Sequence, residues 1–455
     1  MIKRKILHIT AHIGGGVGTV LLGYLRFKND DEAQEHIVLS LDKINPVAIA
    51  ILNKLNIKYL DNLRNSFDKI NSAIEKCDVV LLHWWNHPLI SNLLVNHKLP
   101  ECRLLLWSHI SGFAPPNNFT KKIFKYPDLF IFTTPLSYFT PEYVDLSLYE
   151  QEKVSAIWST AGVERLEGIS SKEHVKKGFN VGYVGSLDFS KIHPNILEIC
   201  GVIDIPNINF IFVGPINQFI VDAANKLNLS DRIRFTGYIS EAEKWQELNA
   251  FDVFGYPLAP HHYGTCDQVL QEAMALGVPP VVLNNPMESY MVTHNRNGLV
   301  AESISEYIQA IHSIYNNKDL RKKLSSNARE FAKNEYSIVN MCNQWDELFE
   351  KAIKIKKNKK NWPSIGNGEN IKTEPYKAFT ESLGLHAGIF NEYFSPKKLK
   401  REVIQEQLRR LGSSHNWKSD NKSTVHQFSS FFPDDPMLSE LSFLMRNKYD
   451  YEKNK

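Results

Sequence analysis

A polar loop and the helix that follows it carry residue types that could bind a phosphorylated ligand. An apolar strand ends at Tyr256, and a loop of small and polar residues leads into a helix that contains Glu272 and closes near Gly277. Loop amides at a helix start bind phosphates, and a carboxylate accepts hydrogen bonds from hydroxyl groups. A nucleotide sugar requires both kinds of contact. The loop residues expected to line this site are Gly264, Thr265, Cys266, Asp267 and Gln268.

These residues also have ordinary structural explanations, which the sequence leaves open. Glu272 could be an exposed helix residue or a carboxylate favoured by the helix dipole. Asp267 and Gln268 could be N-cap residues of the same helix.

A lysine and a histidine follow two other predicted strands. Lys191 comes shortly after a strand end, where a flexible ammonium group suits a phosphate, although a solvated lysine is the plain alternative. His109 follows the apolar run Leu104–Trp107, so its side chain should emerge at a strand end. A hydrogen-bonded core histidine is the alternative there.

A glycine-rich turn follows the first predicted strand. Gly15 and Gly16 lie in this turn, before the next helix, where backbone amides could approach an anion. A tight turn without a ligand remains open, because the spacing is neither that of a P-loop nor a full dinucleotide fingerprint.

Other histidines are weaker candidates for the acceptor side of a site. They are His12, His83, His261 and His262. No carboxylate stands at ligand spacing from them in the sequence, so we predict no metal site.

Composition excludes several classes of protein. A net charge of +3 over 455 residues does not indicate a nucleic-acid partner. Five scattered cysteines indicate neither a disulfide framework nor a zinc site, and they fit a reducing cytosol. The N-terminal apolar run is too short for a signal peptide or a membrane span, so we expect a cytoplasmic protein.

Short, nearly continuous apolar runs alternate with amphipathic stretches along most of the chain. This pattern indicates strands buried on both faces and joined by crossover helices, which is a parallel α/β sheet. The pattern restarts near Val181, so the fold class is two doubly wound, Rossmann-like domains that face each other across a cleft. The predicted organisation is an acceptor-side domain over 1–170, a donor domain over 171–335, a crossover helix over 336–355, and a linker with a helical extension over 356–455.

The extension predicts a basic helix. Ser395 and Pro396 begin it, Gly412 ends it, and its apolar stripe is Leu399, Val403, Leu408 and Leu411. Its basic residues are Lys397, Lys398, Lys400, Arg401, Arg409 and Arg410. Peripheral contact with the inner face of an anionic membrane is one interpretation, and a helix docked on the protein is the other. The apolar residues after Phe428 should fold back or contact a partner.

The order of these motifs resembles glycosyltransferase family 4, which comprises retaining enzymes of GT-B fold. The run Glu272–Pro279 resembles the family's donor-site helix, and six further motifs occur in the family's order. They are the glycine-rich turn, Ser108–His109, Ala161–Glu164, Val184–Gly185, Phe235–Tyr238 and Asn297–Val300. The resemblance covers about residues 1–355. It implies donor contacts from Gly185, Ser186, Gly237 and Tyr238, and roles for His109, Lys191 and Glu272 in catalysis.

Two departures from the family's pattern affect the site. Gly264 stands where the family has a second glutamate that contacts the transferred sugar, and Ser186 replaces a phosphate-binding arginine. Because of these departures, the resemblance determines neither the identity of the sugar nor how the charge of the diphosphate is neutralised.

The resemblance implies transfer of a sugar from a nucleotide diphosphate donor, with retention and without a metal or other cofactor. The acceptor would be a hydroxyl of a glycan, a lipid-linked sugar or a protein, and the resemblance implies a role in bacterial surface polysaccharide or glycoconjugate synthesis. The alternatives are an epimerase or a phosphorylase on the same fold, and an inactive sugar-nucleotide-binding protein. A nicotinamide oxidoreductase is the weakest alternative.

Overall fold

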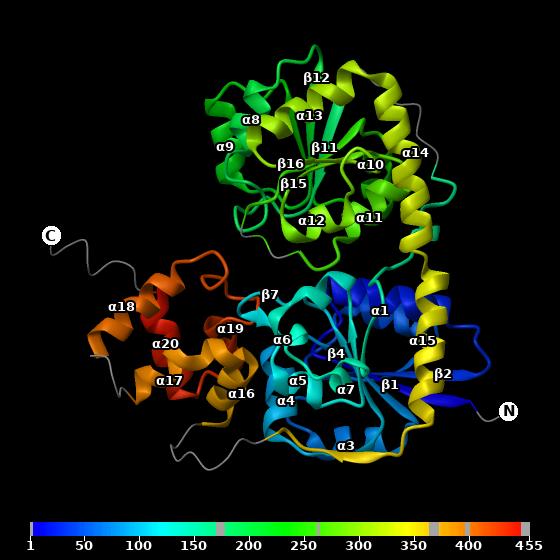
Figure 1. The fold of residues 1–455 in the computed structure, drawn as a ribbon, viewed down its shortest axis with the longest axis vertical. Helices are drawn as coiled ribbons and strands as arrows, with labels where there is room; N and C mark the ends of the chain where they lie inside the picture. Colours follow the sequence, from blue (N-terminus) through cyan, green and yellow to red (C-terminus); the bar gives the residue numbers. More distant parts are fainter. Residues whose placement is uncertain are drawn as a thin grey trace. The chain divides into compact units, whose positions relative to one another are not determined.

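The computed structural model describes residues 3–169, 178–260, 262, 264–363, 373–395 and 401–446. The chain forms two compact units (Figure 1). The first unit combines Met1–Ser159 with Cys342–Lys455, and the second unit is Thr160–Met341. The second unit is therefore an insertion in the first.

The first unit is built on a parallel seven-stranded sheet in the order β10-β9-β6-β4-β1-β2-β3. Its strands are β1 (Arg4–Thr10), β2 (Gln34–Ser40), β3 (Lys58–Leu60), β4 (Val79–Trp84), β6 (Leu104–Ser108), β9 (Leu129–Phe132) and β10 (Val154–Ala156). Its crossover helices include α1 (Gly15–Phe27), α2 (Pro46–Lys54), α3 (Phe67–Glu75) and α4 (Pro88–Asn96). All residues of β4 and β6 are buried, as expected for central strands covered on both faces.

The second unit contains a parallel six-stranded sheet in the order β13-β12-β11-β14-β15-β16. Its strands are β11 (Phe179–Val184), β12 (Ile208–Val213), β13 (Ile233–Gly237), β14 (Val253–Tyr256), β15 (Pro280–Leu283) and β16 (Leu299–Ala301). Its helices are α8 (Ile196–Val202), α9 (Gln218–Lys226), α10 (Glu241–Asn249), α11 (Gln268–Ala275), α12 (Pro286–Met291), α13 (Ile304–Asn316) and α14 (Lys318–Glu335). The predicted fold class, two Rossmann-like domains with a helical C-terminal part, is confirmed.

The chain returns to the first unit through α15 (Ile338–Ile353). The lysine-rich stretch that follows contains a short strand, β17 (Asn358–Lys360), which pairs antiparallel with β5 (Leu99–Cys102). Lys360 is buried and forms an ion pair with Asp128 at 2.6 Å. This part of the predicted linker is thus bound to the first unit.

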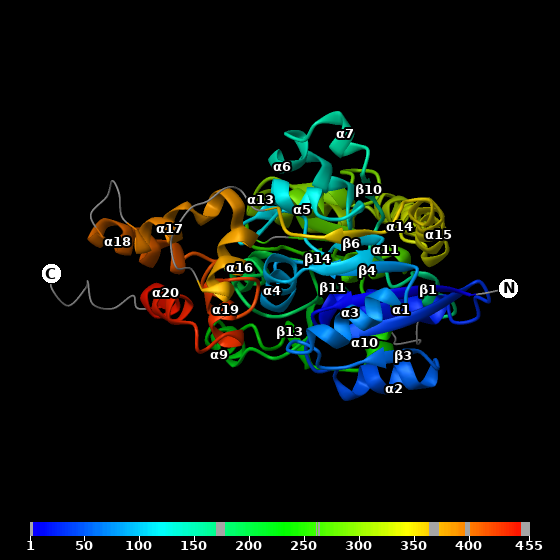
Figure 2. The ribbon, with the colours of Figure 1, turned by 90° about the horizontal axis from the view of Figure 1, so that it is seen from below.

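The C-terminal extension is a helical cluster built onto the first unit. Its helices are α16 (Glu374–Leu383), α17 (Gly388–Phe394), α18 (Arg401–Gly412), α19 (Val425–Phe431) and α20 (Pro436–Arg446). Figure 2 shows α16 and α19 beside α4. Asn86 donates hydrogen bonds to the carbonyls of Asn118 and Ser382, which ties the extension to the loops around α4. The prediction that the apolar tail folds back is confirmed, and Phe428 and Leu441 are fully buried.

Helix α18 docks on this cluster through part of the predicted apolar stripe. Ile404 and Leu408 are fully buried and Leu411 packs against the cluster, whereas Val403 is 43% exposed. Leu399 and the basic residues Lys397, Lys398 and Lys400 lie outside the described residues. None of the described helices is long and apolar enough to cross a membrane.

Candidate functional site

The order of the second sheet reverses between β11 and β14, and the loops after these two strands run side by side. His193 donates its backbone N–H to the carbonyl of Pro257 (2.9 Å), and Ala259 donates to the carbonyl of Lys191 (2.7 Å). In open α/β sheets, ligands bind outside the carboxyl ends of the strands at such a reversal. The Lys191 loop and the loop that leads to α11 therefore flank the expected binding position.

Gly185 and Lys191 approach each other in the first of these loops. A Cβ atom at Gly185 would lie 2.9 Å from the hydroxyl of Tyr183 and 3.2 Å from Nζ of Lys191, and the glycine has φ = +151°. The Lys191 ammonium also lies 5.4 Å from the centre of the Tyr256 ring. The residue after Gly185, Ser186, accepts a hydrogen bond from Tyr183 through its carbonyl (2.9 Å). The backbone of Gly185 and the ammonium group of Lys191 therefore border the same position.

The second loop explains why residue 264 is a glycine. A Cβ atom there would lie 2.5 Å from Cβ of Met287 and 3.2 Å from Oε1 of Glu288, so α12 leaves no room for a glutamate side chain. Glu288 brings a carboxylate close to the same place from another element. Its side chain is 1% exposed, and the carboxyl group of Asp267 lies next to it. Glu288 was not among the residues expected from the sequence, because it lies in a short helix after β15 and belongs to no motif there.

Glu288 shares its surroundings with Asp267 and His262. One candidate ligand atom from each of these three side chains lies within 4.8 Å of the others. Burial, followed by the Asp267 charge, raises the pKa of Glu288 well above its usual range. The inference that no carboxylate stands at ligand spacing from the weaker histidine candidates is therefore wrong for His262. His261, the residue before it, lies outside the described residues.

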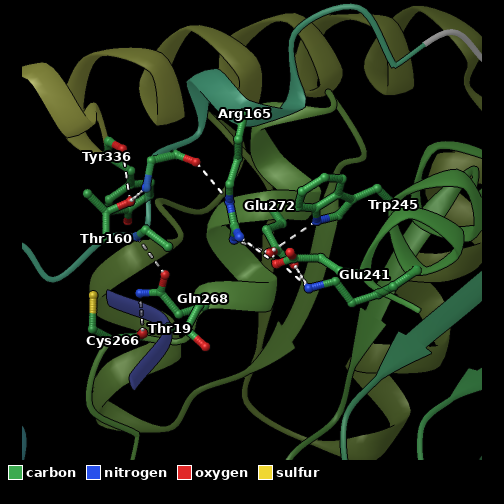
Figure 3. A network of polar contacts seen from close by, with 12 residues as sticks. Thr19, Thr160, Arg165, Glu241, Trp245, Cys266, Gln268, Glu272 and Tyr336 are labelled. Carbon is green, nitrogen blue, oxygen red and sulfur yellow. Dashed lines mark hydrogen bonds and ion pairs between the residues drawn. The ribbon is translucent and has the colours of Figure 1, made fainter. Parts of the chain in front are cut away.

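Glu272 lies in α11, and a buried network holds its carboxylate (Figure 3). The side chain is 3% exposed. Nη2 of Arg165 lies 2.5 Å from Oε1, and Nζ of Lys244 lies 2.9 Å from Oε1 and 2.8 Å from Oε2. Trp245 donates its indole N–H to the same carboxylate (3.3 Å), and Arg165 also pairs with Glu241 (2.6 Å). The sequence indicated that Glu272 lies on a helix but not which residues bind its carboxylate. Its burial excludes the alternative of an exposed residue.

The start of α11 is held by the segment that enters the unit. Gln268 accepts a hydrogen bond from the backbone N–H of Ala161 (3.0 Å), and Thr160 donates its hydroxyl to the carbonyl of Tyr336 (3.0 Å), as Figure 3 shows. Asp267 occupies the N-cap position of α11 but makes no capping bond through its side chain. Cys266 is buried and lies 2.9 Å from Nε2 of Gln271. Gln268 therefore has a structural contact, while the carboxylate of Asp267 is not used as a cap.

The remaining predicted donor contacts of this unit lie at loop positions. Gly237 ends β13 with φ = +74°, and Tyr238 after it is 88% exposed. Thr265 is half-buried beside Cys266. An exposed tyrosine after a strand is free to stack on a planar ligand.

The other predicted contacts belong to the first unit. Helix α1 begins at Gly15, and a Cβ atom at Gly15 or Gly16 would meet nothing within 4 Å. His109 directly follows β6, as expected, and donates its backbone N–H to the carbonyl of Trp84 (2.7 Å). Its ring is half-buried and lies 3.0 Å from the ring of His83, measured between Nε2 of His109 and Nδ1 of His83.

Comparison with solved structures identifies the fold. A glycosyltransferase from Rickettsia africae is 15% identical and superposes with a TM-score of 0.62 over 78% of this chain and 100% of that one. Anabaena HepE in complex with UDP is 16% identical, with a TM-score of 0.60 over 77% and 100%. The chain has the GT-B fold. Sucrose-phosphate synthase from Thermosynechococcus elongatus shares this GT-B fold at 16% identity, with a TM-score of 0.55 over 77% and 99%.

Sequence comparison adds a family match within the second unit of this GT-B chain. Residues 166–331 match the family described as glycosyl transferases group 1. An uncharacterized 41.2 kDa protein in the cps region of Klebsiella pneumoniae is 20% identical over 371 residues, which are 76% of this chain and 99% of the relative. A Dictyostelium discoideum GDP-Man:Man(3)GlcNAc(2)-PP-Dol alpha-1,2-mannosyltransferase is 30% identical over 124 residues, 27% of this chain and 24% of the relative. The family match and the fold together support a glycosyltransferase.

Proposed function

We propose that the protein transfers a sugar from a nucleoside diphosphate sugar to an acceptor hydroxyl. The observation that carries the proposal is where the family match falls: residues 166–331 include Lys191, Asp267, Glu272 and Glu288, which the second sheet positions at its carboxyl edge. Lys191, Asp267 and Glu288 lie close together there, at a strand-order reversal, where nucleotides bind in doubly wound folds. Anabaena HepE, of the same fold, was crystallised with UDP.

Lys191 is the proposed partner of the diphosphate. Its ammonium faces the loop of Gly185, so it can add a charge-assisted bond to the backbone amides that approach a phosphate. Ser186 is uncharged and stands where the family has an arginine. Lys191 is therefore the cation that we propose for the diphosphate. Glu272 is the proposed acceptor for ribose hydroxyls. Because three donors already bind its carboxylate, a ribose would bind in exchange for one of them.

Asp267 and Glu288 are the residues proposed to bind the hydroxyl groups of the sugar. Two carboxyl groups so close together disfavour double ionisation, and sugar hydroxyls donating to them would relieve the repulsion. Glu288 thereby supplies from α12 the carboxylate that Gly264 lacks. This assignment predicts that a sugar deprived of one hydroxyl binds much more weakly, since a site built for a hydroxyl leaves its polar group unpaired without it.

The proposed chemistry is retention without a metal. The acceptor hydroxyl would attack the anomeric carbon on the face from which the nucleoside diphosphate leaves. Stabilisation of the departing diphosphate by Lys191 and the loop amides would be the main contribution of this unit. His109 of the first unit is the proposed contact to the transferred sugar.

We further propose a role in surface polysaccharide or glycoconjugate synthesis, with a glycan, lipid-linked or protein acceptor. The cps-region relative in Klebsiella pneumoniae supports this assignment. Peripheral contact with a membrane stays a prediction. Arg410 and Arg409 on α18 both lie near Glu406, at 3.0 Å and 4.0 Å, which reduces the free positive charge of this face.

A thermal-shift panel tests the proposed function. UDP-, GDP-, ADP- and dTDP-sugars, the free diphosphates and a nicotinamide dinucleotide are added in turn, and a ligand at about 100 times its dissociation constant should stabilise by about 2.7 kcal/mol. We expect one sugar nucleotide to raise the melting temperature, and Lys191→Ala to reduce the rise strongly at the same ligand concentration. Lys226→Ala, on an exposed lysine at the end of α9, is the matched control. A panel without any response among sugar nucleotides would refute the proposal.

Product analysis separates the remaining alternatives. An epimerase converts the donor without an acceptor, a phosphorylase requires phosphate, and an inactive binding protein shows a thermal shift without turnover. The departures at Gly264 and Ser186 motivate the inactive alternative, but Glu288 restores a carboxylate at the first of these positions. We therefore expect turnover once the acceptor is supplied.

A further inference from the structure

Four imidazole rings form a continuous hydrogen-bonded chain through the first sheet. Nδ1 of His36 lies 3.0 Å from Nε2 of His8, Nδ1 of His8 lies 3.1 Å from Nε2 of His83, and Nδ1 of His83 lies 3.0 Å from Nε2 of His109. The rings come from β2, β1, β4 and the residue after β6, which are neighbours in the sheet. Each inner ring uses both of its nitrogens in this chain.

The register of the strands gives the chain a direction. His8 is paired with Val38 on one side and Leu81 on the other, and His83 is paired with Trp107. Each step across the sheet therefore advances two residues along the strands, which keeps all four side chains on one face. The chain begins at His36, deep in the sheet, and ends at His109 beyond the carboxyl end of β6. That edge is where doubly wound sheets bind ligands.

All four rings are neutral near pH 7. Burial, followed by the charges of neighbouring rings, lowers the pKa of His8 and His83 well below the usual value, and burial lowers the pKa of His109 to about 3. Burial and then the nearby Lys28 ammonium lower the pKa of His36 to about 4, while Asp31 acts in the opposite direction. A neutral imidazole carries one N–H and one lone pair, so each N–N contact needs one proton.

Counting these protons leaves two arrangements. If His36 carries its proton on Nδ1, then His8, His83 and His109 must each carry theirs on Nδ1 as well. If His36 carries it on Nε2, all four rings carry it on Nε2. Any mixture leaves one contact with two protons or with none. The tautomer at one end of the chain therefore determines the tautomer at the other.

The surroundings of His36 select between the two arrangements. Its Nε2 is buried and has no hydrogen-bond partner among the described residues. An N–H group at this position would lack an acceptor, and its hydrogen would be repelled by the nearby ammonium of Lys28. A lone pair at Nε2 avoids this repulsion. The surplus N–H is better placed at the other end, on His109, the one ring of the four that is only half-buried.

We propose that His36, His8 and His83 are positioning residues that hold His109 in its neutral Nδ1–H tautomer. His109 then presents a hydrogen-bond donor at the carboxyl edge of the first sheet and cannot act there as a base through Nδ1. The value of this donor for catalysis, as a contact to an oxygen of the transferred sugar, rests on the proposed function. The tautomer itself does not.

NMR of the protein labelled with 15N-histidine tests the tautomer without any substrate. In the unsubstituted protein, His109 should show a protonated Nδ1 and an unprotonated Nε2, and the signal is assigned by its loss in His109→Gln. His36→Asp places an acceptor oxygen where Nδ1 of His36 lies, so it should reverse the whole chain and move the proton of His109 to Nε2. His312→Asp, on a half-buried histidine of α13 in the second unit, is the matched control and should change nothing.

Three results would overturn the proposal: Nε2–H on His109 in the unsubstituted protein, an unchanged His109 signal in a folded His36→Asp variant, or a reversed tautomer with unchanged turnover. If His36→Asp does not fold, His8→Phe serves instead, because cutting the chain should leave His109 as a mixture of tautomers. In active enzyme we expect His36→Asp to lower kcat at least tenfold with the donor affinity unchanged. Absence of transferase activity in the unsubstituted protein would refute the proposed function and leave the NMR result decisive for the tautomer.

Discussion

The histidine chain predicts that the first unit loses stability as soon as the pH falls below neutrality. The folded-state pKa values of His8, His36, His83 and His109 lie below the usual value, so the native rings stay neutral where the unfolded chain takes up protons. For a base whose pKa is lowered by folding, stability is complete above the unfolded pKa of about 6.5 and is lost as the pH falls towards the folded value.

The size of the effect follows from proton binding. Between about pH 7.5 and pH 5.5, an unfolded histidine passes from about one-tenth to nine-tenths protonated, while the native ring binds almost none. Each histidine therefore contributes a loss of about 1.4 kcal/mol, and the four contribute about 5 kcal/mol. His87 and His426, whose pKa values burial lowers to about 3 and about 4, act in the same direction. Typical domain stability is about 5 to 15 kcal/mol, so this is a large fraction of it.

Urea unfolding at the two pH values, followed by tryptophan fluorescence, measures the effect. Of the eight tryptophans, all except Trp245 belong to the first unit, so the signal reports mainly that unit. Replacing His8 with leucine should reduce the difference between the two pH values by about 1.4 kcal/mol, whereas His312→Leu should leave it unaltered. A free energy of unfolding that is constant or rises on acidification would refute the assignment of neutral buried rings.

Three further predictions concern the second unit. Lys191→Ala should weaken the binding of a nucleoside diphosphate by about 1.5 to 3 kcal/mol but leave nucleoside binding intact; calorimetric titration with an equal loss for both ligands would assign Lys191 to structure alone. Gly264→Glu should lower the free energy of unfolding by about 1 to 3 kcal/mol, since the new side chain would overlap Met287. A stable variant that binds the donor more tightly would contradict the steric explanation. Arg165→Ala removes one donor from the buried carboxylate of Glu272 and should cost about 1 to 3 kcal/mol in urea unfolding. The loss should be smaller in Arg165→Lys, and equal stability of all three proteins would show that the pair contributes nothing.

The architecture was predictable from the sequence because its strands are short, apolar and regularly spaced. The runs at Val79–Trp84 and Leu104–Ser108 became fully buried central strands, and the restart near Val181 became β11. The helix carrying Glu272 was also found correctly, since a strand, a polar loop and a helix with Gly277 near its end form a local pattern. Local periodicity is sufficient for such elements.

Contacts between distant elements could not be predicted in the same way. Glu288 reaches Gly264 only because α12 packs against the loop before α11, and Lys244 reaches Glu272 only because α10 packs beside α11. The four histidines are scattered through the first 109 residues, and their alignment needs both the strand order and the register of the sheet. A single sequence contains neither of these directly.

The insertion of the second unit into the first also sets an order of folding during synthesis. Residues 160–341 are complete on leaving the ribosome before Trp345 and Phe349 of α15, both fully buried in the first unit, have been made. Domains fold as units as the chain emerges. The inserted unit can thus complete its fold while the first unit, whose seven strands have all been made, still lacks the packing of Trp345 against Trp107. A nascent chain that stalls after residue 341 but before Trp345 would expose this apolar surface. We expect a chaperone to bind the N-terminal part of such a chain.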